Sequence, residues 1–498
     1  MLSALFQGIS NVFSWPTILF LLAGSALGQI FGILPGLTGS VAMALLISFT
    51  FGMTPEQAMA LLGGAMGAAT FGGSITAILF NTPGTPNNTA TCLDGYPLSQ
   101  QGKAGLALGA GATASALGAL VGLIVLMAII PVMRQVVLAF GPPEFFLLAI
   151  FGLTLIAAIS EGSFLNGLIA GAFGLLISTI GLSPVAIDKR FTFGTLYLWD
   201  GIKLIPALIG LFAIAEMINL LVNAKTISRS GTLIKGGVLE GVKSVFKNFF
   251  LFLRCSAIGT FIGAVPGVGG SVSNFVAYTH AVQTEKNGNF GKGDVRGVIA
   301  SESSNDAKDG GALIPALSLG IPGCPTAAMI LGGLLIHGIF PGKDLMVDNL
   351  PLVFTLIVTL ALSNIFTSTV GLLLGNQLIR ITTMPTTVLA PIILVLTTVG
   401  AFAYQKSMGD VLVAIGFGLL GYLMIKIDFS RIPVVIALVL GPIAEPAFHT
   451  SLDISRGSYT IFFTRPFSLI LIVLIILGIG FPFIQTHRKR KAKIKQPP

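Results

Sequence analysis

A Pro-Gly pattern set in apolar sequence occurs twice in this chain, once in each half. The first copy, here called the first tip, reads Gly32-Ile33-Leu34-Pro35-Gly36-Leu37-Thr38-Gly39-Ser40-Val41, and the second tip reads Gly263-Ala264-Val265-Pro266-Gly267-Val268-Gly269-Gly270-Ser271-Val272. Each tip is followed by a Pro-Gly-x-Pro element, which forms the first break at Pro83-Gly84-Thr85-Pro86 and the second break at Pro322-Gly323-Cys324-Pro325. Proline and glycine interrupt helices and leave backbone groups unpaired.

The composition places these interruptions in a membrane. Of 498 residues, 54% are hydrophobic and 9% are charged, whereas a soluble domain carries about 25% charged residues. A spanning helix needs about 20 apolar residues, so we predict an all-α integral membrane protein with roughly ten to twelve crossings, including broken or re-entrant segments near Leu45–Leu79 and Ala312–Ile339. Matched interruptions in two halves are typical of broken helices around a central site.

The charge distribution predicts how the chain is oriented and divided. The net charge is +9, and basic residues collect in the loop Ala224–Lys247 and in the tail 486–498. By the positive-inside rule we expect both segments in the cytoplasm. Because this rule accounts for the positive net charge, we do not expect a nucleic acid as a partner. The loop separates a first half, 1–240, from a second half, 241–498. An uncharged N-terminus on the outside would make the second half an inverted repeat of the first.

The tips and breaks are candidate binding sites for an anion. A helix that starts after a tip exposes backbone N–H groups with partial positive charge. The first break is followed by Asn and Thr side chains that can donate to carboxylates or accept from sodium. The predicted substrate-binding residues are Pro35, Gly36, Thr38, Gly39, Ser40, Asn81, Thr82, Gly84, Thr85, Asn87, Asn88, Gly267, Gly269, Gly270, Ser271, Gly323 and Thr326. Among them, Gly84 is expected to approach the ligand directly, so that Gly84→Val would abolish binding and spare the fold.

The run Ser301–Asp309 is the most unusual polar segment of the chain. Charged residues at membrane depth are costly and mark functional sites. We therefore predict cation binding at Ser301, Ser304, Asn305 and Asp306. The alternative is a loop at the membrane surface, which applies most to Lys308 and Asp309.

Several activities have no counterpart in the sequence. It contains no G-x-x-x-x-G-K-[ST] phosphate loop, no H-E-x-x-H and no G-x-S-x-G element. The four histidines are scattered, and the three cysteines lack metal spacing. We expect neither an enzyme nor a metal centre, and no cofactor other than Na⁺ or H⁺ as a coupling ion.

The combined motifs resemble those of the TctA family, the large membrane subunit of tripartite tricarboxylate transporters. The similarity rests on the first tip, Gly63-Gly64-Ala65-Met66-Gly67, Phe71-Gly72-Gly73-Ser74, Asn81–Asn88, Asp94-Gly95-Tyr96-Pro97, Pro266–Ser271, Ser301–Asp306 and Gly320–Pro325. The resemblance implies a multi-pass protein of the bacterial inner membrane that takes up tri- or dicarboxylates with a cation, most simply Na⁺. It also implies a small TctB-like membrane subunit and a periplasmic TctC-like solute-binding protein as partners.

Two other classes of function remain open at this point. An uncoupled channel or exporter for small organic anions would use the same broken helices, and a scaffold subunit would transport nothing. A homo-oligomer is compatible with the sequence. Dependence of uptake on a binding protein and on a sodium gradient would separate these classes.

Overall fold

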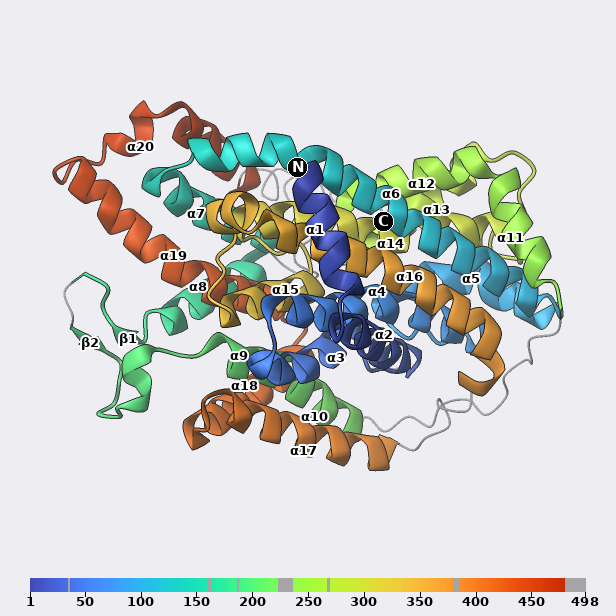
Figure 1. Ribbon diagram of the computed structural model, residues 1–498, viewed down its shortest axis with the longest axis horizontal. Coiled ribbons are helices and arrows are strands. Elements are labelled where there is room, and N and C mark those ends of the chain that lie inside the picture. Colours follow the sequence, from blue (N-terminus) through green and yellow to red (C-terminus); the bar gives the residue numbers. More distant parts are fainter. Residues whose placement is uncertain are drawn as a thin grey trace, which may run out of the picture. The chain divides into compact units, whose positions relative to one another are not determined.

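The computed structural model describes residues 1–34, 36–159, 164–185, 188–222, 236–266, 269–378 and 386–479. In this part of the chain, helices account for almost all regular structure (Figure 1). The two strands, β1 (Gly181–Leu182) and β2 (Lys189–Arg190), form one short antiparallel pair. The predicted all-α fold class is confirmed, whereas the tail 486–498 and residues 224–235 of the basic loop lie outside the described residues.

The chain forms two compact units. The larger unit comprises Met1–Arg134, Ile205–Ser318 and Pro322–Tyr422, and the smaller unit comprises Gln135–Leu204, Leu319–Ile321 and Leu423–Pro498. All tips and breaks predicted to bind substrate belong to the larger unit or to its boundary. The predicted halves, 1–240 and 241–498, follow the sequence repeat and do not coincide with these two compact units. The division into halves remains a prediction.

The larger unit contains the same order of helices twice. The first series is α1 (Leu2–Phe13), α2 (Thr17–Ile33), α3 (Gly39–Leu46), α4 (Pro55–Phe80), α5 (Thr89–Gln100) and α6 (Ala104–Ala139). The second series is α11 (Val238–Lys247), α12 (Phe249–Gly263), α13 (Gly269–Thr284), α14 (Val295–Leu319), α15 (Pro325–Ile336) and α16 (Leu350–Leu378). In each series a tip follows the second helix and a break follows the fourth. The opening pair bends by 73° between α1 and α2 and by 81° between α11 and α12.

Shorter elements complete the larger unit. They are η1 (Ile47–Gly52), η2 (Pro86–Asn88), η5 (Asp344–Asp348), α9 (Leu204–Leu208), the π-helical turn η4 (Ile209–Ile214), α10 (Ala215–Val222), α17 (Thr386–Gln405) and α18 (Met408–Lys426). α4 runs unbroken from Pro55 to Phe80, so the interruption predicted in Leu45–Leu79 lies at η1, ahead of α4. Thr54 starts α4 with a capping box to Gln57, which satisfies two free backbone N–H groups.

The smaller unit packs α19 against α7 and α8. Its elements are α7 (Pro142–Ile159), α8 (Phe164–Ser178), β1, β2, η3 (Tyr197–Asp200), α19 (Ile432–Ile454), α20 (Ile461–Thr464) and the helix Pro466–Ile479. Leu147, Ile436 and Phe462 lie in its apolar core. Two ion pairs tie its segments together, Arg190 with Glu445 at 2.6 Å and Arg465 with the buried Glu144 at 2.6 Å.

Seven of the described helices are long and apolar enough to cross a membrane, or nine if each bent pair is one span. Five shorter apolar helices accompany them, including Pro325–Ile336 and a segment from Gly39 to Gly52 that joins α3 and η1. The segment Gly39–Gly52 begins within the first tip, and the helix Pro325–Ile336 begins at the last residue of the second break. This arrangement agrees with helices that start inside the membrane rather than at its surface.

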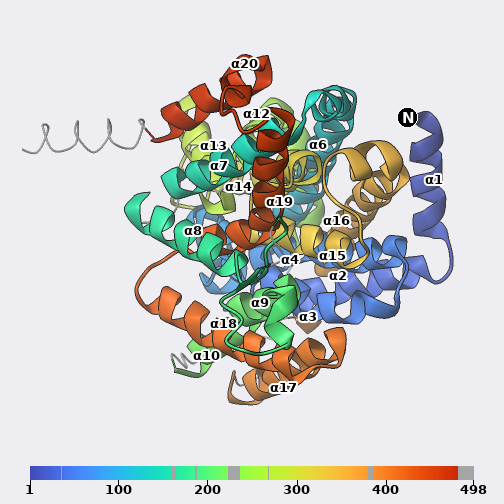
Figure 2. The same cartoon turned by 90° about the vertical axis from the view of Figure 1, so that its left-hand side faces the viewer.

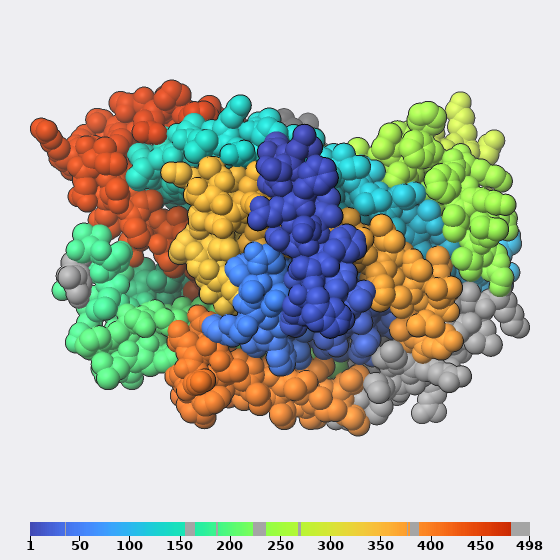
Figure 3. All heavy atoms as spheres, in the orientation of Figure 1, coloured from blue at the N-terminus to red at the C-terminus, as the bar shows by residue number. Residues whose placement is uncertain are grey.

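Helix α1 lies at the surface of the larger unit beside α16 (Figures 2 and 3). Its outer face carries exposed apolar side chains, among them Leu2, Phe6 and Phe13. Its inner face meets α16 at Gly8, where a Cβ would lie 2.6 Å from Cβ of Phe354. The second series repeats this contact, since Gly109 of α6 packs against the backbone of Val238 in α11.

Small residues bring the helices of each series into backbone contact. In the first series, Gly24, Gly28 and Gly32 of α2 lie against the backbone of α4. In the second series, Gly259 and Gly263 of α12 lie in the same way against the backbone of α14. Glycines one turn apart permit this close approach, which supplies van der Waals contact where lipid removes the hydrophobic driving force.

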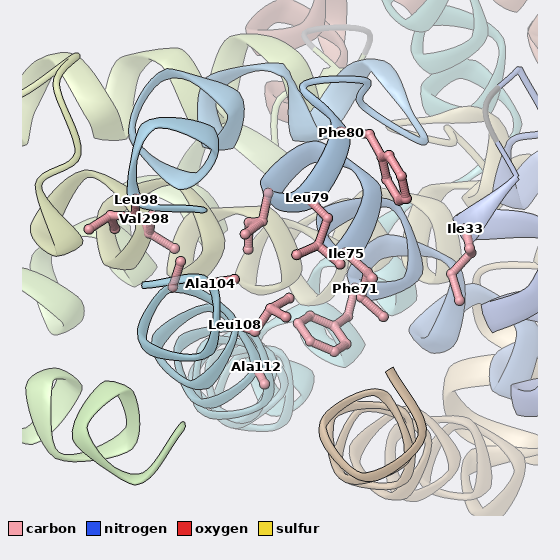
Figure 4. Packing of buried hydrophobic residues seen from close by; sticks show 12 residues of the cluster. Ile33, Phe71, Ile75, Leu79, Phe80, Leu98, Ala104, Leu108, Ala112 and Val298 are labelled. Carbon is pink, nitrogen blue, oxygen red and sulfur yellow. The ribbon is translucent and has the colours of Figure 1, made fainter. Parts of the chain in front are cut away.

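The apolar side of α4 forms a core with α6 (Figure 4). Phe71, Ile75 and Leu79 from α4 meet Leu108 and Ala112 from α6, and all five are almost completely buried. Large aromatic and branched side chains fill the space on this side of α4. The core therefore holds α4 between a glycine-lined helix and a bulky apolar face.

We predict that Gly28→Ala lowers the melting temperature of the detergent-solubilised protein. A Cβ at this position would lie 2.7 Å from Cα of Ala65, so α2 and α4 would have to separate. Overpacking of this kind costs about 1–3 kcal/mol. Gly416→Ala in α18 is the matched control, because no heavy atom lies within 4 Å of a Cβ there. Equal melting temperatures for the two variants would contradict the packing argument.

Candidate functional site

The first tip and the second break meet in the larger unit. Thr38 precedes α3, and its hydroxyl lies 2.7 Å from that of Ser40. A Cβ on Gly39 would lie 3.7 Å from Cγ2 of Thr326, the second residue of α15. Thr38 and Thr326 are both half-buried, so this junction is partly exposed. Residues predicted separately from two halves of the sequence are thus brought together here.

The second tip and the first break also meet. A Cβ on Gly270 would lie 2.6 Å from the amide carbon of Asn87 and would collide with Cε of Lys308. Asn274, on the second turn of α13, donates from its side chain to the backbone carbonyl of Asn87. Gly270, Asn87 and Lys308 therefore form one cluster that joins α13, η2 and α14. Each tip thus meets the residue that follows the break of the other series, whereas the glycine of each break lies against the first residue of the tip in its own series.

Other predicted substrate residues serve the first break itself. Asn88 is buried, and its amide donates to Thr70 O at 3.1 Å and Ser74 Oγ at 2.8 Å, while Thr85 Oγ1 donates to Asn88 Oδ1 at 2.6 Å. Thr82 Oγ1 donates to the carbonyl of Phe80 at 3.2 Å. These groups are already satisfied, which favours a role in folding the chain back onto α4.

The remaining predicted positions differ in their surroundings. Gly36 adopts a φ of +85° and is exposed, and Asn81 ends α4 in the left-handed conformation and is exposed as well. Gly323 backs onto the carbonyl of Gly263, 3.0 Å from where its Cβ would lie. Gly269 begins α13, and Ser271 is half-buried in its first turn. Pro35 and Gly267 lie outside the described residues.

The polar run Ser301–Asp309 is helical and buried. It lies inside α14, and every residue in it is at most 5% exposed. The alternative of a loop at the membrane surface is therefore wrong, for Lys308 and Asp309 as for the rest. α14 carries these charges through the interior of the larger unit, whereas its counterpart α4 is apolar and equally buried.

The four predicted cation ligands do not share one face of α14. Ser301 contacts Thr91 of α5 at 3.0 Å, and Ser304 contacts Ser273 of α13 at 2.7 Å. Asp306 instead accepts from Ser115 of α6. Asp306 Oδ1 and both polar atoms of the Asn305 amide are buried without a hydrogen-bond partner among the described residues. Of the predicted set, Asn305 and Asp306 thus retain the free ligand atoms.

Glu302 is a buried carboxylate that the sequence-based site omits. Its Oε2 accepts from Ser74 Oγ at 2.6 Å, and its Oε1 accepts from Thr91 Oγ1. Asn305 lies close by but makes no hydrogen bond of ordinary geometry with it. Hydroxyl groups from α4 and α5 of the first series thus surround an acid of the second series.

Lys308 and Asp309 form a buried ion pair of 2.7 Å, and they are also missing from the predicted set. A signal for these groups is present in the sequence. Glu302, Asp306 and Asp309 recur at i, i+4 and i+7, which is the period of one helix face. The run contains no proline, and the next proline follows several residues later. The sequence is therefore compatible with a continuous helix through the run.

Asp94 links α5 to the start of α14. Its Oδ1 accepts from the backbone N–H groups of Gly293 and Asp294, each at 2.9 Å, and its Oδ2 accepts from Tyr278 OH at 2.9 Å. Asp94 itself is fully buried. This carboxylate satisfies free donors ahead of a helix N-terminus, which fixes α14 against the first series.

We predict that Gly84→Ala reduces stability, which replaces the expectation that Gly84 lies against the ligand. Its N–H donates to Gly73 O at 3.3 Å, and a Cβ would lie 2.5 Å from Cα of Gly73 and collide with the carbonyl of Gly32. Thermal unfolding should therefore shift to lower temperature. Gly52→Ala, with no atom within 4 Å of the added Cβ, is the control. Unchanged stability with lost ligand affinity would restore the original expectation.

Comparison with known proteins assigns the family. The model of the tripartite tricarboxylate transporter TctA family matches residues 18–436. An uncharacterised 52.8 kDa protein in the TAR-I ttuC′ 3′ region of Agrobacterium vitis is 30% identical over 506 residues, which cover 99% of this chain and 98% of that protein. An uncharacterised protein in the TAR-II ttuC′ 3′ region of the same organism is 30% identical over 237 residues, 47% of this chain and 98% of that protein. No solved structure matches significantly. The family match covers both tips, both breaks and the two series of helices except α1, and the chain belongs to the tripartite tricarboxylate transporter TctA family.

Proposed function

We propose that this protein is the subunit that carries carboxylates into the bacterial cell by secondary active transport. Membership of the TctA family makes it a tricarboxylate transporter subunit. The observation that supports a translocation site in this chain is the contact of each tip with the residue that follows the break of the other series. Gly39 meets Thr326, and Gly270 meets Asn87. Half-helix ends that converge inside a membrane protein suit an anionic substrate.

Energetics support coupling to a cation. Moving one elementary charge across 100 mV involves about 2.3 kcal/mol. A di- or trivalent anion that enters a negative cell is thus opposed by roughly 5–7 kcal/mol. Cotransported Na⁺ or H⁺ would offset this cost. Asn305 and Asp306, with unpartnered buried oxygens, are the groups of the predicted set that best suit such a cation.

The repeated order of helices supports a two-fold mechanism. We propose that the two series are inverted repeats whose tips and breaks lie near the membrane midplane. The matching bent pairs, the matching positions of tips and breaks, and the glycine contacts α2–α4 and α12–α14 support this arrangement. A TctC-like binding protein would deliver the substrate from the periplasm, and a TctB-like subunit would complete the inner-membrane complex.

The decisive experiment is uptake of radiolabelled citrate, and separately succinate, into cells that express the chain with a TctB-like and a TctC-like protein. We expect uptake that requires the binding protein and an inward sodium or proton gradient. Uptake without any gradient would indicate a channel. If neither acid is taken up with all components present, the protein is a scaffold subunit that does not itself transport.

We predict that Asn305→Ala and Ser271→Ala each reduce uptake with normal membrane insertion. Asn305 would lose the unpartnered amide next to Glu302, and Ser271 would lose a hydroxyl in the first turn of α13. A group bonded to a charged ligand contributes about 1.5–3 kcal/mol, so initial rates should fall roughly tenfold or more. Thr369→Ala on α16, whose exposed hydroxyl bonds only its own helix, is the control. Wild-type rates and ion dependence in both site variants would contradict the assignment.

A further inference from the structure

We propose that Lys308 is the cationic anchor for a substrate carboxylate and that Asp309 occupies this position when the site is empty. On binding, the carboxylate would replace Asp309 as the acceptor of the Lys308 ammonium. Asp309, once released, would be neutralised by the coupling cation. This inference rests on the proposed function and adds to it the residue that binds the anion and the step that joins the anion to the cation.

The geometry of the ion pair is the first observation. Lys308 and Asp309 are neighbours in α14, and Lys308 Nζ lies 2.7 Å from Asp309 Oδ1. Adjacent residues in a helix point about 100° apart and do not normally face each other. The lysine must therefore turn its end around the helix to reach this acid. We expect this ion pair between adjacent residues when no carboxylate lies on the side of the helix from which the lysine side chain projects.

The surroundings of the lysine stem are the second observation. Its Cε lies against Gly270, in the first turn of α13, and the Asn87 amide lies against the same glycine. Neither neighbour is an acid. The N-terminal N–H groups of a 16-residue helix, a carboxamide and an ammonium group meet here. This concentration of donors suits a second anion besides Asp309.

An unpartnered buried amide is the third observation. Asn305 is fully buried, and neither its oxygen nor its nitrogen has a hydrogen-bond partner among the described residues. Residues three and four apart on a helix are neighbours, so Asn305 lies beside Lys308 and Asp309. A buried amide without partners is costly unless a ligand satisfies it. Its nitrogen can donate to the incoming carboxylate, and its oxygen can accept from the cation.

The second break contributes a partly exposed group near the ion pair. Cys324 is half-buried and lies within electrostatic range of both Lys308 and Asp309. Asn87, which lies beside the lysine stem, is half-buried as well, whereas Lys308 and Asp309 are each 5% exposed. The pair thus lies near partly exposed groups. A small movement at the second tip or second break would open it.

The exchange is balanced in charge. Before binding, the ammonium and the Asp309 carboxylate neutralise each other. Afterwards, the ammonium keeps its three protons and pairs with the substrate carboxylate, and Asp309 carries one uncompensated negative charge in a buried position. A buried charge left without a partner is strongly unfavourable. One Na⁺ or one proton at Asp309 restores neutrality, so the substrate carboxylate and the cation stabilise each other's binding.

The test is direct binding to the purified full-length protein in detergent. Citrate and succinate are titrated calorimetrically in sodium chloride and in choline chloride, and melting temperatures are recorded in parallel. For the wild type we expect binding that sodium, or lower pH in choline, strengthens. Lys308→Gln should weaken binding roughly tenfold or more. Asp309→Asn should bind at least as tightly as the wild type in choline and lose the enhancement by cations.

Two further variants separate a binding role from a structural one. The double variant Lys308→Gln with Asp309→Asn removes both charges of the ion pair together, so neither member is left without the other, and it should retain its fold and yet fail to bind. Glu144→Gln breaks a buried ion pair in the smaller unit and should lower the melting temperature without changing affinity. Citrate affinity of the wild-type level in a folded Lys308→Gln protein, or intact cation enhancement in Asp309→Asn, would overturn this inference alone. A wild-type protein that binds neither acid under any condition would overturn the proposed function as well.

Discussion

The structure of the larger unit depends on how it accommodates the buried charges of α14. Glu302, Asp306, Lys308 and Asp309 lie in one helix and are almost inaccessible to water. Each such charge is costly in a protein interior unless it is paired or hydrogen-bonded. The helices around α14 supply those partners: Ser74 from α4, Thr91 from α5 and Ser115 from α6. The hydrogen bonds to these buried charges therefore require the same arrangement of α4, α5 and α6 around α14 as the packing does.

Those partners come from the first series, although α14 belongs to the second. The glycines Gly118 and Gly122 of α6 allow its backbone to contact that of α14 near Ser303 and Ala307. Asp94 fixes the start of α14 to α5 through the N–H groups of Gly293 and Asp294. A change in the charge state of α14 would thus be felt by both series. This mutual dependence is what coupling of an anion to a cation requires.

The two series use the same backbone plan for different purposes. α4 and α14 are both enclosed by neighbouring helices and both contact a glycine-lined helix, α2 or α12. α4 contributes apolar side chains such as Phe71 and Ile75 to a core, whereas α14 contributes charges to a polar centre. The central helix of the first series is thus apolar, whereas that of the second series carries the ionisable groups. The apolar packing of α4 provides the fixed surface against which the polar groups of α14 are positioned.

The sequence by itself determined the fold class, the duplicated tips and breaks, and the family resemblance. Apolar composition and the positions of Pro and Gly are local properties, and a chain with so few charges has no soluble alternative. Only the tertiary structure decided which groups meet. Contacts with distant helices decide whether Asn88 binds a ligand or the polypeptide around its own turn. They also decide whether Gly84 faces a substrate or the carbonyl of Gly32. The same holds for Lys308, whose position beside Gly270 and Asn87 arises because the second tip packs against the residue that follows the first break, and these segments are far apart in the sequence.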